Sequence, residues 1–261
     1  MSISLIVTTY NRPDALLLVL KSIECQILPP SEVIIADDGS DERTKNLISD
    51  FNSQSNLEII HSFHEDLGFR AAESRNKAIS NSKSDYIILV DGDMILHPEF
   101  IVDHIKNAKF GFFIQGSRAL LTEKKTKDVI IRRQLVFNFL SRGMNNRLNS
   151  IHSNFLSKIF SIKKNYLTGT KTCNMSFFKK DCISVNGFNN EFKGWGREDS
   201  EFIVRFLNKG INRKTLKFSA IQYHLWHNEA NRSSLLTNDK LLQKAKVEGL
   251  DWCENGIDKF L

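Results

Sequence analysis

The chain of 261 residues is 41% hydrophobic and 25% charged, which excludes disordered and fibrous proteins and leaves room for one large α/β domain. Its net charge of +6 arises in residues 124–164, where ten Lys or Arg accompany one acid, so the remainder is slightly acidic. Four cysteines without a short paired spacing argue against a zinc cluster or a disulfide framework and favour a reducing compartment.

The apolar run at the N-terminus is short and has no basic lead-in, so it predicts a first strand rather than a signal peptide. No apolar run in the chain is long enough to span a bilayer. We therefore expect a cytoplasmic protein, soluble or peripheral on the inner face of the membrane.

The first hundred residues alternate between apolar strand patterns and helix patterns. Residues 3–9 predict a strand, and Asn11 as N-cap with Pro13 in the first turn predicts a helix to about residue 23. This strand–helix unit recurs. Strands are expected over residues 32–36, 57–61 and 86–90. One helix is expected after a cap at Ser40, and another over residues 70–80. This alternation predicts a doubly wound, mostly parallel sheet flanked by helices.

Three polar clusters follow three of these strands, at residues 8–12, 37–40 and 91–93. The carboxyl ends of parallel strands share one edge of the sheet, where ligands bind in such folds. Asp91 and Asp93 offer the hard oxygen ligands that suit Mg²⁺ or Mn²⁺ bound to a diphosphate, although Asp-Gly is also a common turn. Asp38 can accept hydrogen bonds from a nucleotide, whereas Asp37 is interpreted as structural.

Beyond residue 118 the alternation weakens. The basic stretch 124–164 has apolar residues among its charges, which predicts amphipathic helical segments with loops. This stretch is predicted either to bind an anionic membrane surface or to form a solvated lid over the acceptor groove. Nucleic-acid binding is not expected, because aromatic residues are sparse there. Later strands are expected over residues 172–178 and 214–220.

The segment from Gly194 to Phe202 carries two adjacent acids beside an aromatic residue. On a helix over residues 198–209, Glu198 and Asp199 extend the apolar stripe, while Glu201 and Arg205 are expected on the solvent face. Inward carboxylates are costly unless they are paired, used as caps or used in chemistry. One interpretation is a helix N-terminus; the other is a general base beside Trp195, which would stack on a sugar.

Two histidines, His224 and His227, follow the last predicted strand. A single histidine is most often a hydrogen-bonded structural residue. With a metal expected at Asp93, an imidazole that completes the coordination is favoured, and His224 is chosen because it lies nearer the strand end.

Together these motifs resemble the family 2 glycosyltransferases, inverting enzymes with the GT-A fold. The resemblance rests on residues 8–12, 37–40, 68–76 and 91–93, and covers residues 3–95. The segment Gly194 to Asp199 resembles the acceptor-side motif of β-1,4-galactosyltransferases and bacterial chondroitin polymerase domains. With Tyr223 and His224 at a similar interval, this extends the resemblance to about residue 228.

The resemblance implies one domain over residues 1–261, in which residues 1–118 bind a nucleotide sugar, expected to be UDP-linked, and residues 119–261 bind a glycan or glycolipid acceptor. It implies that Asp38 contacts the base, Asp91 the ribose or sugar, and Asp93 with His224 the metal, Mn²⁺ or Mg²⁺. Asp199 is implied as the base. The donor site would also include Thr9, Tyr10, Asn11, Arg12, Arg75 and Gly92, and the acceptor site Trp195, Gly196 and Glu198.

The implied activity is hexosyl transfer in bacterial surface polysaccharide assembly. Two alternatives stay open from the residues alone. A metal-dependent phosphoryl or nucleotidyl transferase could use the same aspartates. A non-catalytic nucleotide-sugar binding module would have the donor site without the chemistry.

Overall fold

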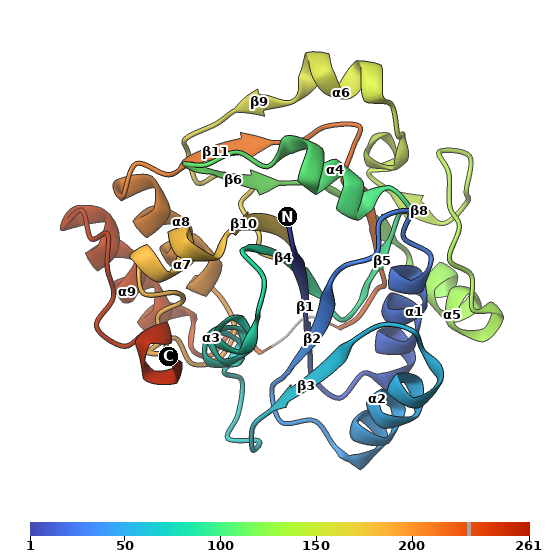
Figure 1. The fold of residues 1–261 in the computed structure, drawn as a ribbon, viewed down its shortest axis with the longest axis horizontal. Helices are drawn as coiled ribbons and strands as arrows, with labels where there is room; N and C mark the ends of the chain where they lie inside the picture. The colour runs from blue at the N-terminus through green and yellow to red at the C-terminus, as the bar shows by residue number, and fades with distance from the viewer. Residues whose placement is uncertain (229–230) are drawn as a thin grey trace.

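The computed structural model describes residues 1–228 and 231–261. Within them the main sheet has the strand order β3-β2-β1-β4-β10-β6-β11-β9 (Figure 1). Its strands in chain order are β1 Ile3–Thr9, β2 Glu32–Asp37, β3 Ile59–Phe63, β4 Tyr86–Asp91, β6 Phe112–Gln115, β9 Ile162–Lys163, β10 Asn174–Phe178 and β11 Asn212–Thr215. Strands β3, β2, β1 and β4 are parallel, whereas β10 is antiparallel to both of its neighbours. The predicted doubly wound, mostly parallel α/β sheet is confirmed.

Helices cover both faces of this sheet, because alternate residues of each buried strand point to opposite faces. On one face, Leu5 and Val7 of β1 pack with the first group of helices, and on the other face Ile6 packs with the second group. The first group is α1 Pro13–Glu24, α2 Glu42–Gln54 and α4 Phe100–Asn107. The second group is α3 Ala71–Asn81, α7 Lys179–Ser184, α8 Glu198–Asn208 and the 3-10 helix η2 Ile257–Phe260.

A second sheet extends the edge where the polar clusters lie, in the order β5-β12-β7-β8. Its strands are β5 Met94–Leu96, β7 Arg118–Leu121, β8 Met144–Asn145 and β12 Gln222–His224. The strand predicted over residues 214–220 is wrong in extent, because β11 ends at Thr215. His224 lies in a separate strand, β12. Around this sheet lie α5 Glu123–Arg132 and the 3-10 helix η1 Arg147–Ser150. Helix α6 Asn154–Phe160 contacts the loop after β11, and α9 Leu235–Val247 packs on α8.

The first two helix caps lie one residue later than predicted. Arg12 is the N-cap of α1, and Asp41 is the N-cap of α2, where its side chain accepts a hydrogen bond from the Thr44 amide. Asn11 and Ser40 instead connect the two loops. The Asn11 amide donates to the Ser40 hydroxyl, and the Asn11 side chain accepts from the Asp41 amide. These bonds fasten the ends of β1 and β2 to each other.

The prediction that Glu201 and Arg205 face solvent is wrong. Both are buried, and Arg205 donates from Nε and Nη2 to the two carboxylate oxygens of Glu201 at 2.7 and 2.8 Å. A third donor, Nη1, bonds to the carbonyl of Val185. Val185, Cys182 and Cys253 lie beside Arg205, so the end of α7 and the C-terminal segment enclose this side of α8, and the two charges must pair internally.

We expect Glu201→Ala to destabilise the fold by about 3–5 kcal/mol, because it leaves the buried Arg205 guanidinium without its counter-charge. Chemical denaturation should show this as a fall in the free energy of unfolding. Glu254→Ala, at an exposed position, is the matched control and should change it by less than about 0.5 kcal/mol. Equal effects of the two variants would contradict the assignment.

Candidate active site

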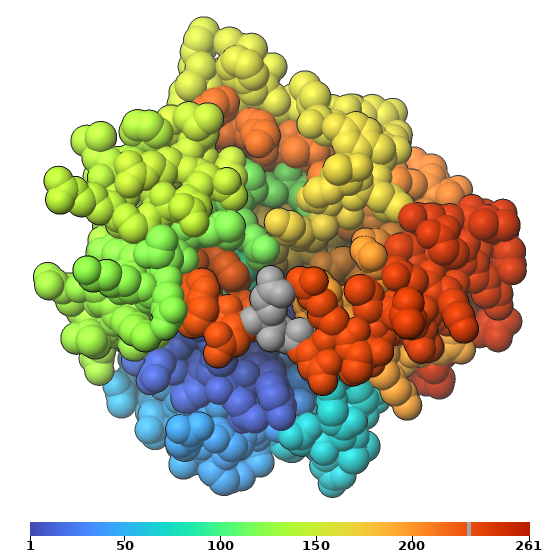
Figure 2. All heavy atoms as spheres, turned by 180° about the vertical axis from the view of Figure 1, so that it is seen from behind, coloured from blue at the N-terminus to red at the C-terminus, as the bar shows by residue number. Residues whose placement is uncertain are grey.

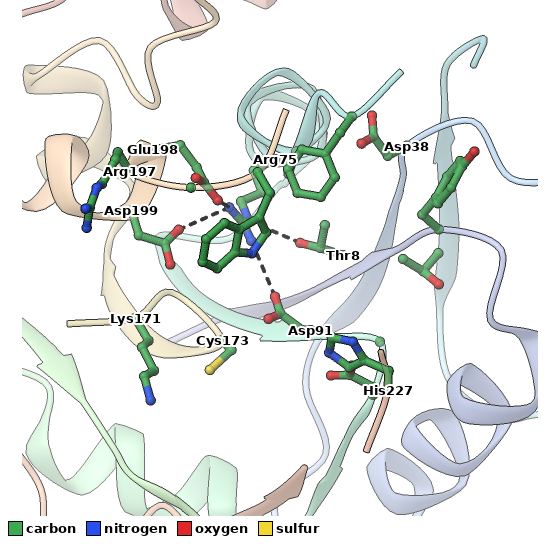
Figure 3. Close-up of a pocket in the computed structure, with 18 of the residues that line it drawn as sticks. Thr8, Asp38, Arg75, Asp91, Lys171, Cys173, Arg197, Glu198, Asp199 and His227 are labelled. Carbon is green, nitrogen blue, oxygen red and sulfur yellow. Dashed lines mark hydrogen bonds and ion pairs between the residues drawn. The ribbon is translucent and has the colours of Figure 1, made fainter. Parts of the chain in front are cut away.

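A cleft of about 770 Å³ opens at the carboxyl ends of β1, β2 and β4 (Figure 3). Segments far apart in the sequence meet there: the ends of the parallel strands form one wall, and the start of α8 with the residues before β10 forms the other. The sequence-predicted residues that line it are Thr9, Tyr10, Arg12, Asp38, Arg75, Asp91, Gly92, Asp93, Trp195, Gly196, Glu198 and Asp199. Asn11 and His224 are not among the lining residues.

Asp93 lies beside two imidazoles. Its Oδ2 is 3.5 Å from Nε2 of His224 and 3.4 Å from Nε2 of His227, so the structure brings both histidines to this carboxylate. Arg12 Nη1 also donates to the same oxygen, at 2.7 Å. The other oxygen, Oδ1, is buried without a hydrogen-bond partner among the described residues. Burial would raise the pKa of Asp93, but the hydrogen bond from His224 and the charges of His224, Arg12 and His227 hold it below the usual value.

This group fits a divalent cation. One carboxylate and two imidazoles supply ligand atoms within 4.8 Å of one another, and the orphaned oxygen of Asp93 has a lone pair to offer. The backbone at residue 92 passes so close to β1 that a glycine suits this position. A Cβ there would lie 3.0 Å from the Thr8 carbonyl oxygen and 3.0 Å from the Thr9 hydroxyl. The glycine therefore lets the loop between the two aspartates pass against β1.

Arg75 is buried among three carboxylates. Its guanidinium lies 3.4 Å from Asp91, 3.5 Å from Glu198 and 3.3 Å from Asp199, and Nε donates to the Thr8 hydroxyl (Figure 3). Burial by itself would lower the pKa of Arg75. The carboxylates, Asp199 foremost, raise it instead, so the guanidinium stays charged. Arg75 thereby links the end of β4 to the start of α8.

Burial also raises the pKa of two acids in the cleft. It raises the pKa of Asp91 to about 6, against the lowering effect of Arg75. Burial and the negative charge of Asp199 raise the pKa of Glu198 to about 7. Near neutral pH, Glu198 can thus hold a proton and donate a hydrogen bond as well as accept one.

Asp199 is held from the opposite side by Thr172, which sequence reasoning missed. The Thr172 amide donates to Oδ2 at 3.1 Å, and its hydroxyl donates to Oδ1 at 2.7 Å. With Arg75 these bonds orient the carboxylate, whose side chain keeps 27% of its surface exposed to the cleft. No sequence pattern relates residue 172 to residue 199, since the contact exists only once β10 and α8 pack together.

An aromatic side chain and a further carboxylate complete the cleft. Trp195 is 40% exposed, and the guanidinium of Arg232 lies 5.3 Å from the centre of its ring. Across the cleft, Asp38 accepts hydrogen bonds from His64 and from the Arg70 amide, at 2.7 and 2.8 Å. His227, the alternative to His224 as metal ligand, also lines the cleft. Further lining residues, to which the sequence assigned no role, are Thr8, Phe69, Ala71, Arg118, Thr170, Lys171, Cys173, Arg197, Ser200, Arg232 and Leu235.

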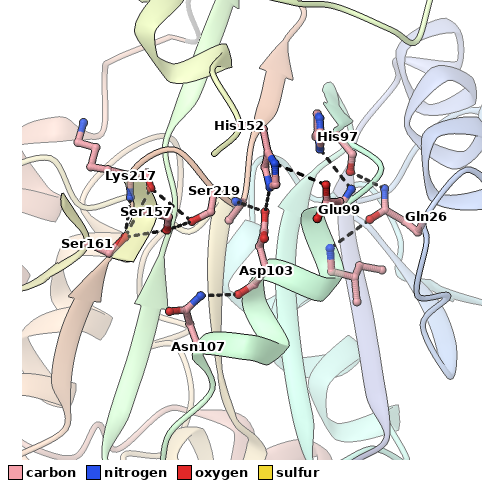
Figure 4. A network of polar contacts seen from close by, with 12 residues as sticks. Gln26, His97, Glu99, Asp103, Asn107, His152, Ser157, Ser161, Lys217 and Ser219 are labelled. Carbon is pink, nitrogen blue, oxygen red and sulfur yellow. Dashed lines mark hydrogen bonds and ion pairs between the residues drawn. The ribbon is translucent and has the colours of Figure 1, made fainter. Parts of the chain in front are cut away.

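A second cluster of acids and histidines lies outside the cleft (Figure 4). His152 bonds through Nε2 to Asp103 at 2.9 Å and lies 3.5 Å from Glu99 through Nδ1, while its ring stacks on His97. The same Asp103 oxygen accepts from the Ala220 amide. Because both ring nitrogens of His152 and this oxygen are already engaged, the cluster is interpreted as structural. It ties His152, within the basic stretch, to α4.

Two family models match the chain. One, described as glycosyl transferase family 2, covers residues 4–182, and the other, described as the N-terminal domain of galactosyltransferase, covers residues 155–228. Among curated proteins, the chain is similar to a chondroitin synthase of Escherichia coli, with 25% identity over 85% of this chain and 34% of the relative. It is similar also to a hyaluronan synthase of Pasteurella multocida, with 28% identity over 85% of this chain and 24% of the relative. The chain thus spans about a third or less of these relatives.

Among solved structures, the chain is similar to S. aureus TarS 1-349 in complex with UDP, with a TM-score of 0.58 and 18% identity over 100% of this chain and 70% of the other. This likeness confirms the GT-A fold that the resemblance implied. The relatives include a validoxylamine A glucosyltransferase of Streptomyces hygroscopicus subsp. limoneus, 25% identical over 93% of this chain and 56% of the relative. The first family model matches well over half of the residues of this chain. The chain therefore belongs to glycosyl transferase family 2 and is a glycosyltransferase.

Proposed function

We propose that this chain transfers a sugar from a UDP-sugar to a hydroxyl group of a glycan or glycolipid, with inversion at the anomeric carbon and with a divalent cation, in the assembly of a surface polysaccharide. The observation that carries the proposal is one cleft with a cation-binding group on one wall and an oriented carboxylate, Asp199, on the other. Residues 1–118 would supply most groups for the donor, and residues 119–261 those for the acceptor.

The donor would lie along the ends of the parallel strands. Asp38 is oriented by His64 and the Arg70 amide, so its remaining lone pairs can accept from the base, while Thr9, Tyr10 and Arg12 line the same wall. The related structure that holds UDP and the relatives named as polysaccharide synthases support a UDP-sugar. Asn11 would act indirectly, because its side chain bonds to the Asp41 amide.

Asp93, His224 and His227 would hold the cation. Of the two ions expected, Mn²⁺ fits this group better, because imidazole is a poorer ligand for Mg²⁺. When bound, the cation would neutralise negative charge on the diphosphate leaving group. Arg12, which bonds to Asp93, would then be free to approach the donor phosphates.

Asp199 would take the proton from the acceptor hydroxyl as the acceptor oxygen attacks the anomeric carbon. Thr172 and Arg75 fix the carboxylate, so that one lone pair faces the cleft. Glu198 and Asp91, beside Arg75, would bind sugar hydroxyls, and Trp195 would stack on the acceptor ring, with Gly196 allowing close approach. A single displacement from the face opposite the leaving group inverts the configuration.

We expect UDP to raise the melting temperature in the presence of Mn²⁺, and one UDP-sugar of a panel to yield a β- or α-linked product of inverted configuration. Differential scanning fluorimetry followed by NMR of the product measures both. Release of pyrophosphate from a nucleoside triphosphate would favour the phosphoryl or nucleotidyl transferase instead. Donor binding without transfer to any acceptor would favour a binding module.

We further propose that the basic stretch 124–164 contacts an anionic membrane. No helix in residues 1–228 and 231–261 is long and apolar enough to cross a bilayer, so contact would be peripheral. The stretch, green to yellow, forms the upper part of the face in Figure 2. It exposes large apolar side chains beside its cations, among them Ile131 at 82%, Leu140 at 78% and Phe155 at 72%. Apolar insertion and attraction to anionic lipid would reinforce each other.

The protein should therefore sediment with vesicles that contain phosphatidylserine at low salt, and high salt should release it. Replacing Ile131, Leu140 and Phe155 together by Ser should weaken this partition by about tenfold or more, because the apolar surface is lost. Leu236→Ser with Val247→Ser, at equally exposed positions of α9, is the control and should leave it unchanged. No sedimentation of the unmodified protein would exclude membrane contact in favour of the lid.

A further inference from the structure

Two cations on the wall of the cleft form no ion pair with a described residue. Lys171 and Arg118 both line the cleft, and neither has a carboxylate within ion-pair distance anywhere in the described part of the chain. Other cleft cations differ in this respect. Arg12 pairs with Asp93, and Arg75 pairs with three acids. The proposed reaction assigns no role to either Lys171 or Arg118.

Asp91 and Asp199 lie near this pair, but the group in direct contact with Arg118 is neutral. Nη1 of Arg118 makes a weak bond of 3.5 Å to the Cys173 sulfur, and its Nε is buried with no acceptor within the described residues. Burial raises the pKa of Cys173 to about 12, so its sulfur is an uncharged thiol. Burial and then the positive charge of Arg118 lower the pKa of Lys171, and the more distant charge of Asp199 offsets this only in part. Holding two like charges close together costs free energy unless a bound ligand supplies an anion that contacts both.

The position of the pair indicates what that ligand is. Lys171 precedes Thr172, which orients Asp199. Cys173 follows directly before the start of β10, where Asn174 pairs with Val90 of β4, next to Asp91. In Figure 3, Lys171 and Cys173 lie on the side of the cleft away from Arg75, next to Asp199 and Asp91. An anion bound there would thus be carried by one of the sugars that react.

We propose that Lys171 and Arg118 form a subsite for an anionic substituent, a carboxylate or a phosphate, on the donor sugar or on the acceptor sugar. This inference rests on the proposed function, since it places the reacting sugars between Asp91 and Asp199. A guanidinium and an ammonium at one site bind such a group by charge-assisted hydrogen bonds, which are stronger than the bonds to a neutral hydroxyl. The subsite would select charged sugars over neutral ones.

Isothermal titration with Mn²⁺ present tests this with matched pairs of ligands. For the donor source, UDP-glucuronate is compared with UDP-glucose; for the acceptor source, p-nitrophenyl β-glucuronide is compared with p-nitrophenyl β-glucoside on the UDP-saturated protein. We expect the anionic member of one pair to bind about tenfold or more tightly than its neutral partner. Which pair shows the preference identifies the sugar that carries the charge.

Lys171→Gln should reduce that preference about fivefold to tenfold and leave the affinity for UDP unchanged, while Lys171→Arg should retain most of it. The Lys171 side chain is exposed to the cleft, so folding should be unaffected, and Lys83→Gln at the opposite edge of the sheet is the control. Loss of UDP affinity in Lys171→Gln would assign the pair to the diphosphate and overturn the proposal, as would the absence of a preference in both pairs. Failure of UDP to bind the unmodified protein would instead contradict the proposed function.

Discussion

Asp199→Asn is expected to lower kcat about 10²- to 10⁴-fold, because a positioned general base contributes on that scale. The affinity for UDP should be unchanged, since Asp199 lies on the wall opposite the donor strands. Folding should survive, because Arg75 keeps its contacts with Asp91 and Glu198. Initial rates and calorimetry of UDP binding measure the two effects separately. Asp251→Asn, which removes a surface carboxylate paired with Lys209, is the matched control.

Thr172 refines this test, because it acts only through the carboxylate it orients. Thr172→Val removes the hydroxyl donor but keeps the amide donor, so a smaller loss of kcat, about tenfold, is expected without a change in UDP binding. Thr172→Ser should restore activity. Full activity of Asp199→Asn in a folded protein would remove this residue from the reaction, whatever Thr172 does.

Asp93→Asn is expected to abolish Mn²⁺ binding at micromolar concentrations and, with it, sugar transfer. Loss of groups that merely support a metal ligand already costs about 10- to 100-fold in affinity, and loss of the charged ligand itself should cost at least as much. Mn²⁺ titration followed by electron paramagnetic resonance measures the free ion directly, independently of turnover. Transfer by the unmodified enzyme should also stop with EDTA and resume with Mn²⁺.

The histidines and Arg12 offer comparisons within the same site. His224→Gln and His227→Gln should each weaken Mn²⁺ binding, since both rings lie at similar distances from Asp93. Arg12→Gln should instead strengthen it, because a competing cation at 2.7 Å from the carboxylate is removed. Unchanged Mn²⁺ affinity in Asp93→Asn would show that the cation is held elsewhere or not needed.

The parallel half of the fold could be predicted from the sequence because its signals are local. Each buried strand is an apolar run of its own, and the helices between them are marked by residues such as Pro13. Once the strands are parallel, their carboxyl ends must share an edge, so Asp38, Asp91 and Asp93 could be placed in one cleft without coordinates. The two caps were misplaced by one residue because Asn11 and Ser40 bond to each other's loops, a contact between distant segments.

The sequence by itself determined the parallel half of the sheet, the edge at its strand ends and the acids that lie there, since period and strand ends depend on neighbours along the chain. Only the tertiary structure decided that Glu201 and Arg205 are enclosed, that His227 reaches Asp93 as closely as His224 does, and that Thr172 holds Asp199. It alone brought Lys171 and Arg118 to one wall with no ion-pair partner among the described residues. These features depend on which segments pack together across the cleft, and no local pattern of residues encodes that packing.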